Sequence, residues 1–288
     1  MTLPRFPADC PNLSRMGFWR DDKNRTLMRL KGRLARILCS RWPAALVRIV
    51  TRGVVPSFGM RIDTRTPGVS DKSRAQLLLR LYEGAEIRLV KSHVHDTTCV
   101  VDLGASLGVL AAKAATKLPS GGRLVGVEAN PQLLGLARSN IERNAPHVRV
   151  DMIHGAIDYS REAGSEAVFA SPADHTGAAL ANGGSKTEGF TAPVVRLSRL
   201  LDSEGIGDYT LLADIEGAEA GLLFKDSAAL ERCRQMVIEL HPTTFDGRSL
   251  SREDLLQQVL ALGFEISASY AHVYVLNRSA QGQAASAS

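Results

Sequence analysis

Short apolar runs alternate with amphipathic segments over most of the chain, and this pattern sets the predicted fold. Runs rich in Val, Ile and Leu, with the length of buried strands, lie at 99–103, 123–128, 149–154, 209–214 and 235–240. Segments with apolar residues three or four positions apart, which predict helices, lie at 71–82, 85–92, 109–117, 130–144, 197–202, 219–224 and 251–262. The alternation indicates an α/β fold with a doubly wound, mostly parallel sheet, closed by an antiparallel pair at 264–268 and 272–276.

One long connection interrupts this order. Residues 158–190 are rich in Gly, Ala and Ser, and only 167–170 has the pattern of a strand there, with a second short strand expected at 194–195. Connections of this length are uncommon in compact domains. We expect either a substrate-covering insert or a plain flexible loop.

The amino-terminal region differs from the rest in charge. Residues 1–65 hold 14 Lys and Arg against 4 Asp and Glu, whereas the remainder holds 21 against 26. Leu and Ile recur at helical spacing among arginines over 24–50, which predicts a helix that either packs on the globular part or lies on an anionic membrane surface. Residues 53–70, rich in Gly and Pro, predict a linker or an entry loop. We expect a basic, partly helical extension (1–70), a globular domain (71–278) and a disordered tail (279–288).

Cysteine usage and hydropathy bear on the compartment. Cys10, Cys39, Cys99 and Cys233 lie far apart, which argues against a disulfide framework or a zinc motif. No apolar run has the length of a signal-peptide core or of a membrane-spanning helix. We expect a cytoplasmic protein, with peripheral membrane contact through residues 24–50 as an open alternative.

The strand at 99–103 leads into a glycine turn and then a helix, which is the arrangement of a nucleotide-type site. Gly104 and Gly108 allow backbone N–H groups to approach a ligand, and the helix start favours an anionic group. Asp102 precedes the glycines and would repel a pyrophosphate, but it would attract an ammonium or sulfonium group. The turn therefore favours S-adenosylmethionine over NAD, with Asp102, Gly104, Ala105 and Gly108 at its methionine end.

The next two predicted strands supply candidates for the nucleoside. Glu128 ends one strand, where a carboxylate accepts hydrogen bonds from both ribose hydroxyls. Asn130 follows and is suited to cap the next helix. Beyond the strand at 149–154, an adenine ring would rest on small residues such as Ala156. Asp158 is the side-chain candidate for its amino group, with a solvated loop aspartate as the alternative.

Acidic residues gather after the remaining parallel strands. Asp214 ends a buried apolar run, so its charge must face a ligand, a cation or hydrogen-bond donors. Glu219, in the first turn of the following helix, is expected to be structural. Glu239 and His241 project to one face of their strand, because side chains alternate. We assign Asp214, Glu239 and His241 as the catalytic residues.

These blocks, taken in order from about residue 81 to 278, resemble the FkbM-type family of S-adenosylmethionine-dependent methyltransferases. The resemblance is carried by Tyr82-Glu83, the segments 101–108, 128–131 and 214–219, and Ile238-Glu239 before His241. It implies the seven-stranded class I methyltransferase fold, and methyl transfer to a hydroxyl oxygen of a small molecule or sugar. It also implies cofactor contacts from Glu83, Ser106, Ala129 and Asn130.

The chain departs from the family pattern at two positions. Ser106 stands where the family generally has Asn, and it keeps a hydrogen-bonding side chain. Ala213 stands where the family commonly has Lys, which removes a cation beside the presumed reaction centre.

Methyl transfer needs an aligned acceptor oxygen, exclusion of water and removal of a proton. On this hypothesis the three catalytic residues orient the acceptor, and His241 is the better-matched base near neutral pH. A divalent metal held by Asp214, Glu239 and His241 is an alternative that we do not favour from the sequence.

Three other functions stay open. A nicotinamide-dependent oxidoreductase would need a glycine where Ser106 stands. A non-catalytic cofactor-binding or membrane-surface protein would use the basic amino-terminal segment. A nucleic-acid methyltransferase is disfavoured, because aromatic residues make up 5% of the chain and no stacking platform is evident.

Overall fold

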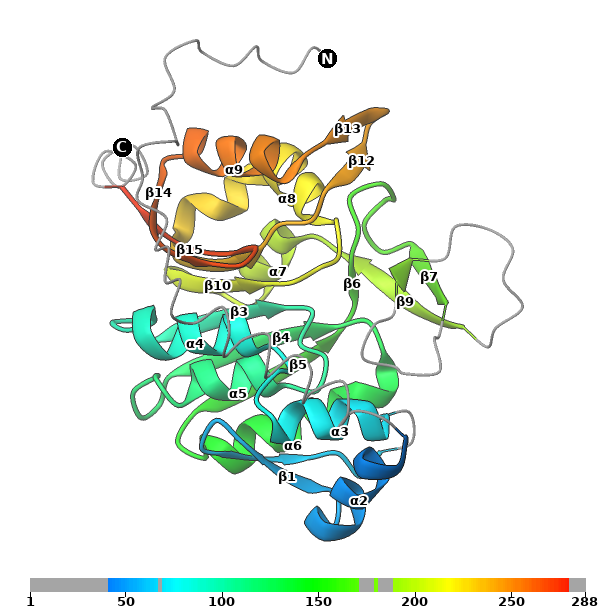
Figure 1. The fold of residues 1–288 in the computed structure, drawn as a ribbon. Helices are drawn as coiled ribbons and strands as arrows, with labels where there is room; N and C mark the ends of the chain where they lie inside the picture. The colour runs from blue at the N-terminus through cyan, green and yellow to red at the C-terminus, as the bar shows by residue number, and fades with distance from the viewer. Residues whose placement is uncertain (1–40, 67–68, 171–178, 181–188, 280–288) are drawn as a thin grey trace, which may run out of the picture.

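The computed structural model describes residues 41–66, 69–170, 179–180 and 189–279. Its centre is a seven-stranded sheet in the order β14–β15–β11–β10–β3–β4–β5 (Figure 1). The parallel central strands are β3 (Cys99–Leu103), β4 (Arg123–Glu128), β5 (Arg149–His154), β10 (Tyr209–Ala213) and β11 (Cys233–Glu239). At one edge, β15 (Val273–Arg278) runs antiparallel to both β11 and β14 (Phe264–Tyr270). The predicted doubly wound, mostly parallel seven-stranded sheet is confirmed.

Helices cover both faces of this sheet (Figure 1). One face packs against α4 (Gly84–His93), α5 (Val109–Ala115) and α6 (Pro131–Asn144). The other packs against α7 (Leu197–Ser203), α8 (Glu219–Lys225), the 3-10 helix Ser227–Arg232 and α9 (Arg252–Ala261). Strand residues alternate between these two layers: Val100 packs with the first and Val101 with the second. Apolar side chains on both faces explain why the strands could be recognised as continuous apolar runs.

The segment predicted as a linker or entry loop contains a paired hairpin at 54–63, so that prediction is wrong for these residues. Helix α2 (Arg41–Thr51) leads into a hairpin of β1 (Val54–Ser57) and β2 (Met60–Asp63), followed by α3 (Asp71–Leu78). Gly53 lies in the turn between α2 and β1 and Gly59 in the turn between β1 and β2; both have positive φ, and neither belongs to a flexible tether. Residues 24–40 of the predicted basic helix lie outside the described residues.

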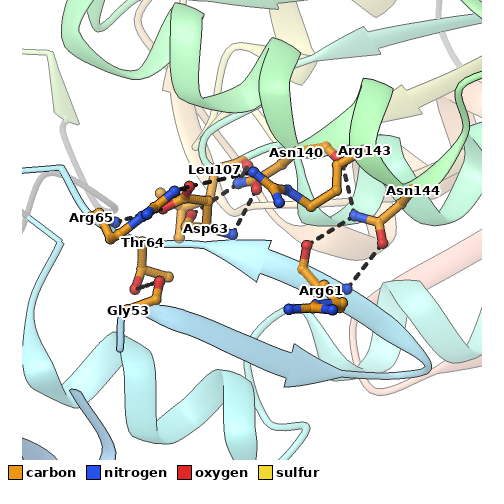
Figure 2. A network of polar contacts seen from close by, with 9 residues as sticks. All are labelled: Gly53, Arg61, Asp63, Thr64, Arg65, Leu107, Asn140, Arg143 and Asn144. Atoms are coloured by element: carbon orange, nitrogen blue, oxygen red, sulfur yellow. Dashed lines mark hydrogen bonds and ion pairs between the residues drawn. The ribbon is translucent and has the colours of Figure 1, made fainter. Parts of the chain in front are cut away.

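Two asparagines of α6 hold the hairpin against the domain (Figure 2). The Asn140 amide accepts a hydrogen bond from Asp63 N at 2.7 Å and donates to Asp63 O at 3.1 Å. It also donates to the carbonyl of Leu107, in the glycine turn, at 2.9 Å. Asn144 makes the same reciprocal pair with the backbone of Arg61. The two side-chain amides make hydrogen bonds to the β2 backbone of the kind that a neighbouring strand would make. These bonds anchor the hairpin beside the predicted cofactor turn.

Short strands surround the main sheet. The predicted strand at 167–170 is found as β7 (Glu166–Ala170), paired with β9 (Phe190–Val195), which is longer than expected. Two further short strands complete this small sheet, β6 (Ala156–Ile157) and β8 (Ala179–Leu180). Most of the connection between β7 and β9 lies outside the described residues, as does the tail from residue 280. The hairpin β12 (Thr243–Phe245) and β13 (Arg248–Leu250) was not predicted.

Within the part of the chain that the structure describes, no helix has both the length and the apolar character needed to cross a membrane.

Candidate functional site

Four carboxylate side chains lie on one face of the sheet, at the carboxyl-terminal end of its parallel strands. They are Asp102, Glu128, Asp214 and Glu239, from β3, β4, β10 and β11. Their strands alternate, so each carboxylate shares the face of core residues that pack against α4–α6, such as Val100, Leu124, Leu212 and Val237. The carboxyl ends of parallel strands lie at the same end of a sheet, so the structure brings these four side chains to one side of the molecule, as expected.

Asp102 is the most deeply buried member of this group. It is 2% exposed, and its Oδ2 atom has no hydrogen-bond partner among the described residues. Burial, with the nearby charges of Glu128 and Asp214, raises the pKa of Asp102 to about 8. A carboxyl group in this condition is stabilised when a cation reaches it, because the ionised form then gains a partner.

The two glycines of the turn are required by close backbone approach. Gly104 has φ of 88°, and a Cβ there would lie 2.4 Å from the carbonyl oxygen of Asp214. Gly108 has φ of 73°, and its Cβ would lie 2.8 Å from the carbonyl oxygen of Ala137. No other residue fits at these positions without displacing backbone. Ala105, between them, is buried.

Backbone N–H groups hold the Glu128 carboxylate in place. Its Oε2 atom accepts from Ser106 N and its Oε1 atom from Asn130 N, both at 2.7 Å. Burial raises the pKa of Glu128, and these N–H groups oppose that shift. Asn130 caps α6, as predicted, since its Oδ1 atom accepts from Gln132 N. The Ser106 hydroxyl is hydrogen-bonded to the Tyr82 hydroxyl at 2.9 Å.

The start of α4 brings two further carboxyl groups to the same pocket. Glu83, at φ of 47°, accepts a hydrogen bond from Leu110 N, at the beginning of α5, through its Oε2 atom. Burial and the charge of Asp102 raise the pKa of Glu83 well above its ordinary value. Glu86, which the sequence analysis missed, is buried and shares a hydrogen bond with Glu239; burial raises its pKa to about 7. Its spacing of three residues from Glu83, in the first turn of a helix, was the available signal.

His241 lies among the carboxylates at the carboxyl-terminal end of the sheet. Its Nδ1 atom is 3.0 Å from Oε1 of Glu219, which is 0% exposed and also accepts from the backbone N–H of Gly217. The hydrogen bond that the His241 ring donates to Glu219 is the main cause that raises the pKa of His241 to about 9. A pKa of about 9 leaves the imidazole protonated at neutral pH, and this disfavours the predicted role of His241 as the base there. Glu219 is structural, as predicted.

Asp214 has the better-matched pKa of the group. Burial, followed by the charge of Glu216, raises it to about 6, so the carboxylate is ionised at neutral pH and can still take a proton. Asp214 Oδ1 and Glu239 Oε1 lie 3.9 and 3.8 Å from His241 Nε2. The structure thus brings together all three residues predicted as catalytic.

A metal-type donor set also occurs here, with a different composition from the one considered in the sequence. One oxygen each of Asp214 and Glu216 and one ring nitrogen of His241 lie within 4.8 Å of one another. Glu216 takes the place that Glu239 had in the sequence-based set.

The residues predicted to contact adenine follow β5. Ala156 is buried in β6, paired with β9. Asp158 is 3% exposed, so the alternative of a solvated loop aspartate is wrong. Its Oδ1 atom accepts from both the N–H and the hydroxyl of Ser160, and Oδ2 pairs with Arg161 at 3.2 Å. Its polar contacts thus lie within its own loop. The carbonyl of Ala129 accepts a hydrogen bond from the His154 ring.

The solved structures that this chain matches are distant from it. An uncharacterized protein from Listeria monocytogenes serotype 4b is 11% identical, with 67% of each chain covered and a TM-score of 0.38. Sp1610 of Streptococcus pneumoniae, a putative tRNA (m1A22) methyltransferase, is 12% identical over 67% of this chain and 69% of that one, with a TM-score of 0.37. Magnesium protoporphyrin IX methyltransferase from Synechocystis PCC 6803, with bound SAH, is 14% identical over 62% and 73%, with a TM-score of 0.34.

The sequence itself gives a more specific match. No curated protein matches it. The model of the methyltransferase FkbM domain matches residues 102–266, which is more than half of the chain and spans every strand-end carboxylate described above. The chain belongs to the FkbM methyltransferase family.

Proposed function

We propose that this protein transfers a methyl group from S-adenosylmethionine to a hydroxyl oxygen of a small molecule or sugar. The observation that carries the proposal is Asp102, a buried carboxyl group whose Oδ2 atom lacks a partner beside a glycine turn. A ligand with a sulfonium and an ammonium group supplies the cation that this position lacks. A dinucleotide pyrophosphate would add negative charge to it.

The residues of the pocket fit the donor part by part. Asp102 and Glu83 face its cationic end, and the turn from Gly104 to Gly108 offers backbone N–H groups. Glu128, already oriented by two N–H groups, is suited to bind the ribose hydroxyls. Ala156 and Asp158 stay predictions for the adenine.

S-adenosylmethionine supplies a methyl group on a positively charged sulfur: the acceptor oxygen forms a bond to that carbon, and the carbon–sulfur bond breaks with its electron pair left on sulfur. The protein must then take the acceptor's hydroxyl proton. Asp214 fits this role, since its pKa of about 6 makes it an ionised base at neutral pH. His241, as a cation, stabilises the ionised carboxylates around it, and Glu239 orients the acceptor.

Calorimetric titration with S-adenosylhomocysteine and with NAD tests the donor. We expect S-adenosylhomocysteine to bind and NAD not to bind, and Glu128→Ala to weaken binding at least tenfold through the lost ribose contacts. Asp208→Asn is the control, because Asp208 makes an exposed ion pair with Arg234. Tight NAD binding without S-adenosylhomocysteine binding would reverse the assignment. Incubation with labelled donor and a panel of hydroxylated compounds then tests the acceptor; transfer only to RNA would overturn that part.

A further inference from the structure

The His241 group contains a donor set that methyl transfer by itself does not require. His241 Nε2 lies 3.9 Å from both Asp214 Oδ1 and Glu216 Oε2, which is too long for a hydrogen bond. Two ligand atoms of one divalent ion, each about 2.1 Å from the metal, lie roughly 3–4 Å apart. Both distances from His241 Nε2 are therefore those expected between ligands of one ion, and the three ligand atoms all lie within 4.8 Å of one another.

A second observation concerns unpartnered buried oxygens. Asp214 Oδ1, the atom that faces His241, is buried and accepts no hydrogen bond from any described residue. Asp102 Oδ2, whose residue is 2% exposed and interacts electrostatically with Asp214, is in the same condition. Hydrogen-bond partners are therefore missing at two separate places. The proposed methyl donor accounts for Asp102 Oδ2, whereas Asp214 Oδ1 has only the His241 ring near it, 3.9 Å away, without a hydrogen bond.

A contact on the other ring nitrogen, Nδ1, also fixes the orientation of His241. Buried Glu219 binds the Nδ1 atom, which leaves Nε2 directed at the carboxylates. Metal-binding histidines characteristically have such a carboxylate on their second nitrogen. Glu216, at the rim with its side chain 64% exposed, leaves access from solvent.

We propose that Asp214, Glu216 and His241 bind one divalent transition-metal ion of the Mn²⁺ class. Carboxylates suit Mg²⁺ and Mn²⁺, while imidazole suits transition metals, so the mixed set favours Mn²⁺ over Mg²⁺. The ion replaces the proton on Nε2, and that proton is released to solvent. The second oxygen of Asp214 stays available for catalysis.

The ion's role rests on the proposed function. Three protein ligands leave coordination positions for the acceptor, so the acceptor class is a compound with two neighbouring oxygens, such as a vicinal diol or a hydroxy-carbonyl compound. Coordination lowers the pKa of the hydroxyl group that is methylated.

Binding is measured on the full chain, after treatment with a chelator, by titration with Mn²⁺ and detection of free Mn²⁺ by electron paramagnetic resonance. We expect one Mn²⁺ per chain, and at least tenfold weaker binding in Glu216→Gln and in Asp214→Asn. Glu142→Gln is the matched control, because Glu142 is 52% exposed on α6, and it should bind Mn²⁺ like the wild type. Calorimetry with S-adenosylhomocysteine is run on the same proteins without metal, and Glu216→Gln should bind it as the wild type does.

The outcomes separate the two proposals. A wild type without saturable binding, or Asp214→Asn and Glu216→Gln variants with wild-type affinity for Mn²⁺, would overturn the metal site even if S-adenosylhomocysteine binds normally. Normal Mn²⁺ binding that is lost in the variants would support it, even if S-adenosylhomocysteine fails to bind and the proposed donor is wrong.

Discussion

Glu219 Oε1 lies 3.0 Å from His241 Nδ1, and this buried carboxylate sets the charge of the imidazole. The contact is the main cause of the raised pKa of His241, about 9. At neutral pH the imidazole is therefore a cation among these carboxylates, and in the proposed mechanism Asp214 accepts the proton. Residue type alone favours His241 as the base, whereas its contact with Glu219 makes Asp214 the better candidate.

The first prediction concerns this pair. In metal-free protein, Glu219→Gln should lower the pKa of His241 from about 9 toward 6.5, because the largest cause of the shift is removed. The stability that the pair contributes is fully present below about pH 6.5 and is lost as pH rises through about 9. An NMR titration of the imidazole measures the shift. Glu216→Gln is the control and should change it less, since Glu216 lies 3.9 Å away; equal shifts would contradict the assignment.

A second prediction follows from the pKa of Asp102, about 8 in the folded protein against 3.8 for the ordinary group. Between these values the folded state holds the extra proton, so this residue lowers stability as pH rises. Asp102→Asn should therefore raise the free energy of unfolding at pH 8 by about 1–3 kcal/mol, and by less at pH 5. Urea unfolding at the two pH values checks this. A destabilised variant at pH 8 would show that Asp102 has a partner in the folded protein.

The third prediction separates close approach from backbone strain at the glycine turn. Gly104→Ala places a Cβ 2.4 Å from Asp214 O, whereas Gly121→Ala, also at positive φ, meets nothing within 4 Å. Gly121→Ala should cost about 1 kcal/mol from conformation alone. Gly104→Ala should cost at least about 3 kcal/mol or abolish S-adenosylhomocysteine binding. Thermal unfolding and calorimetry measure both. Similar effects of the two changes would mean that the approach of β10 to the turn does not matter.

A fourth prediction tests the anchoring of the hairpin (Figure 2). Asn140 is 0% exposed and bonds to both Asp63 and Leu107. Asn140→Ala leaves these buried groups unpaired and should cost about 2–4 kcal/mol. Asn144→Ala removes more exposed hydrogen bonds and should cost about 1 kcal/mol or less. Urea unfolding compares them. An equal cost for the two variants would argue against a special role for Asn140.

The sheet could be predicted because the apolar pattern that marks each strand lies within that strand's own sequence. Strands β3 and β4 are buried on both faces, so their apolar runs mark them within the sequence, and their bounds agree with the structure. The hairpin at 54–63 could not be recognised in this way. Its stabilising partners, Asn140 and Asn144, are about 80 residues away, and its glycines are equally typical of a linker.

The same distinction applies to the site. Asp102 and Glu128 were found because each ends a recognisable strand beside a turn. Glu86 was missed, because its significance comes from its hydrogen bond to Glu239, which is distant in sequence. The protonation of His241 depends on Glu219, on a different element, and no pattern in either segment shows that the two meet.

The central claim is that Asp102 gives up its proton to receive a cationic methyl donor. The most direct test is the affinity for S-adenosylmethionine, measured by calorimetry between pH 6 and 9 in the wild type and in Asp102→Asn. The donor's own titration affects both proteins, so the measured quantity is the affinity of the wild type divided by that of Asp102→Asn. We predict that this ratio rises by up to about tenfold per pH unit until about pH 8. A ratio near one at every pH would contradict the account.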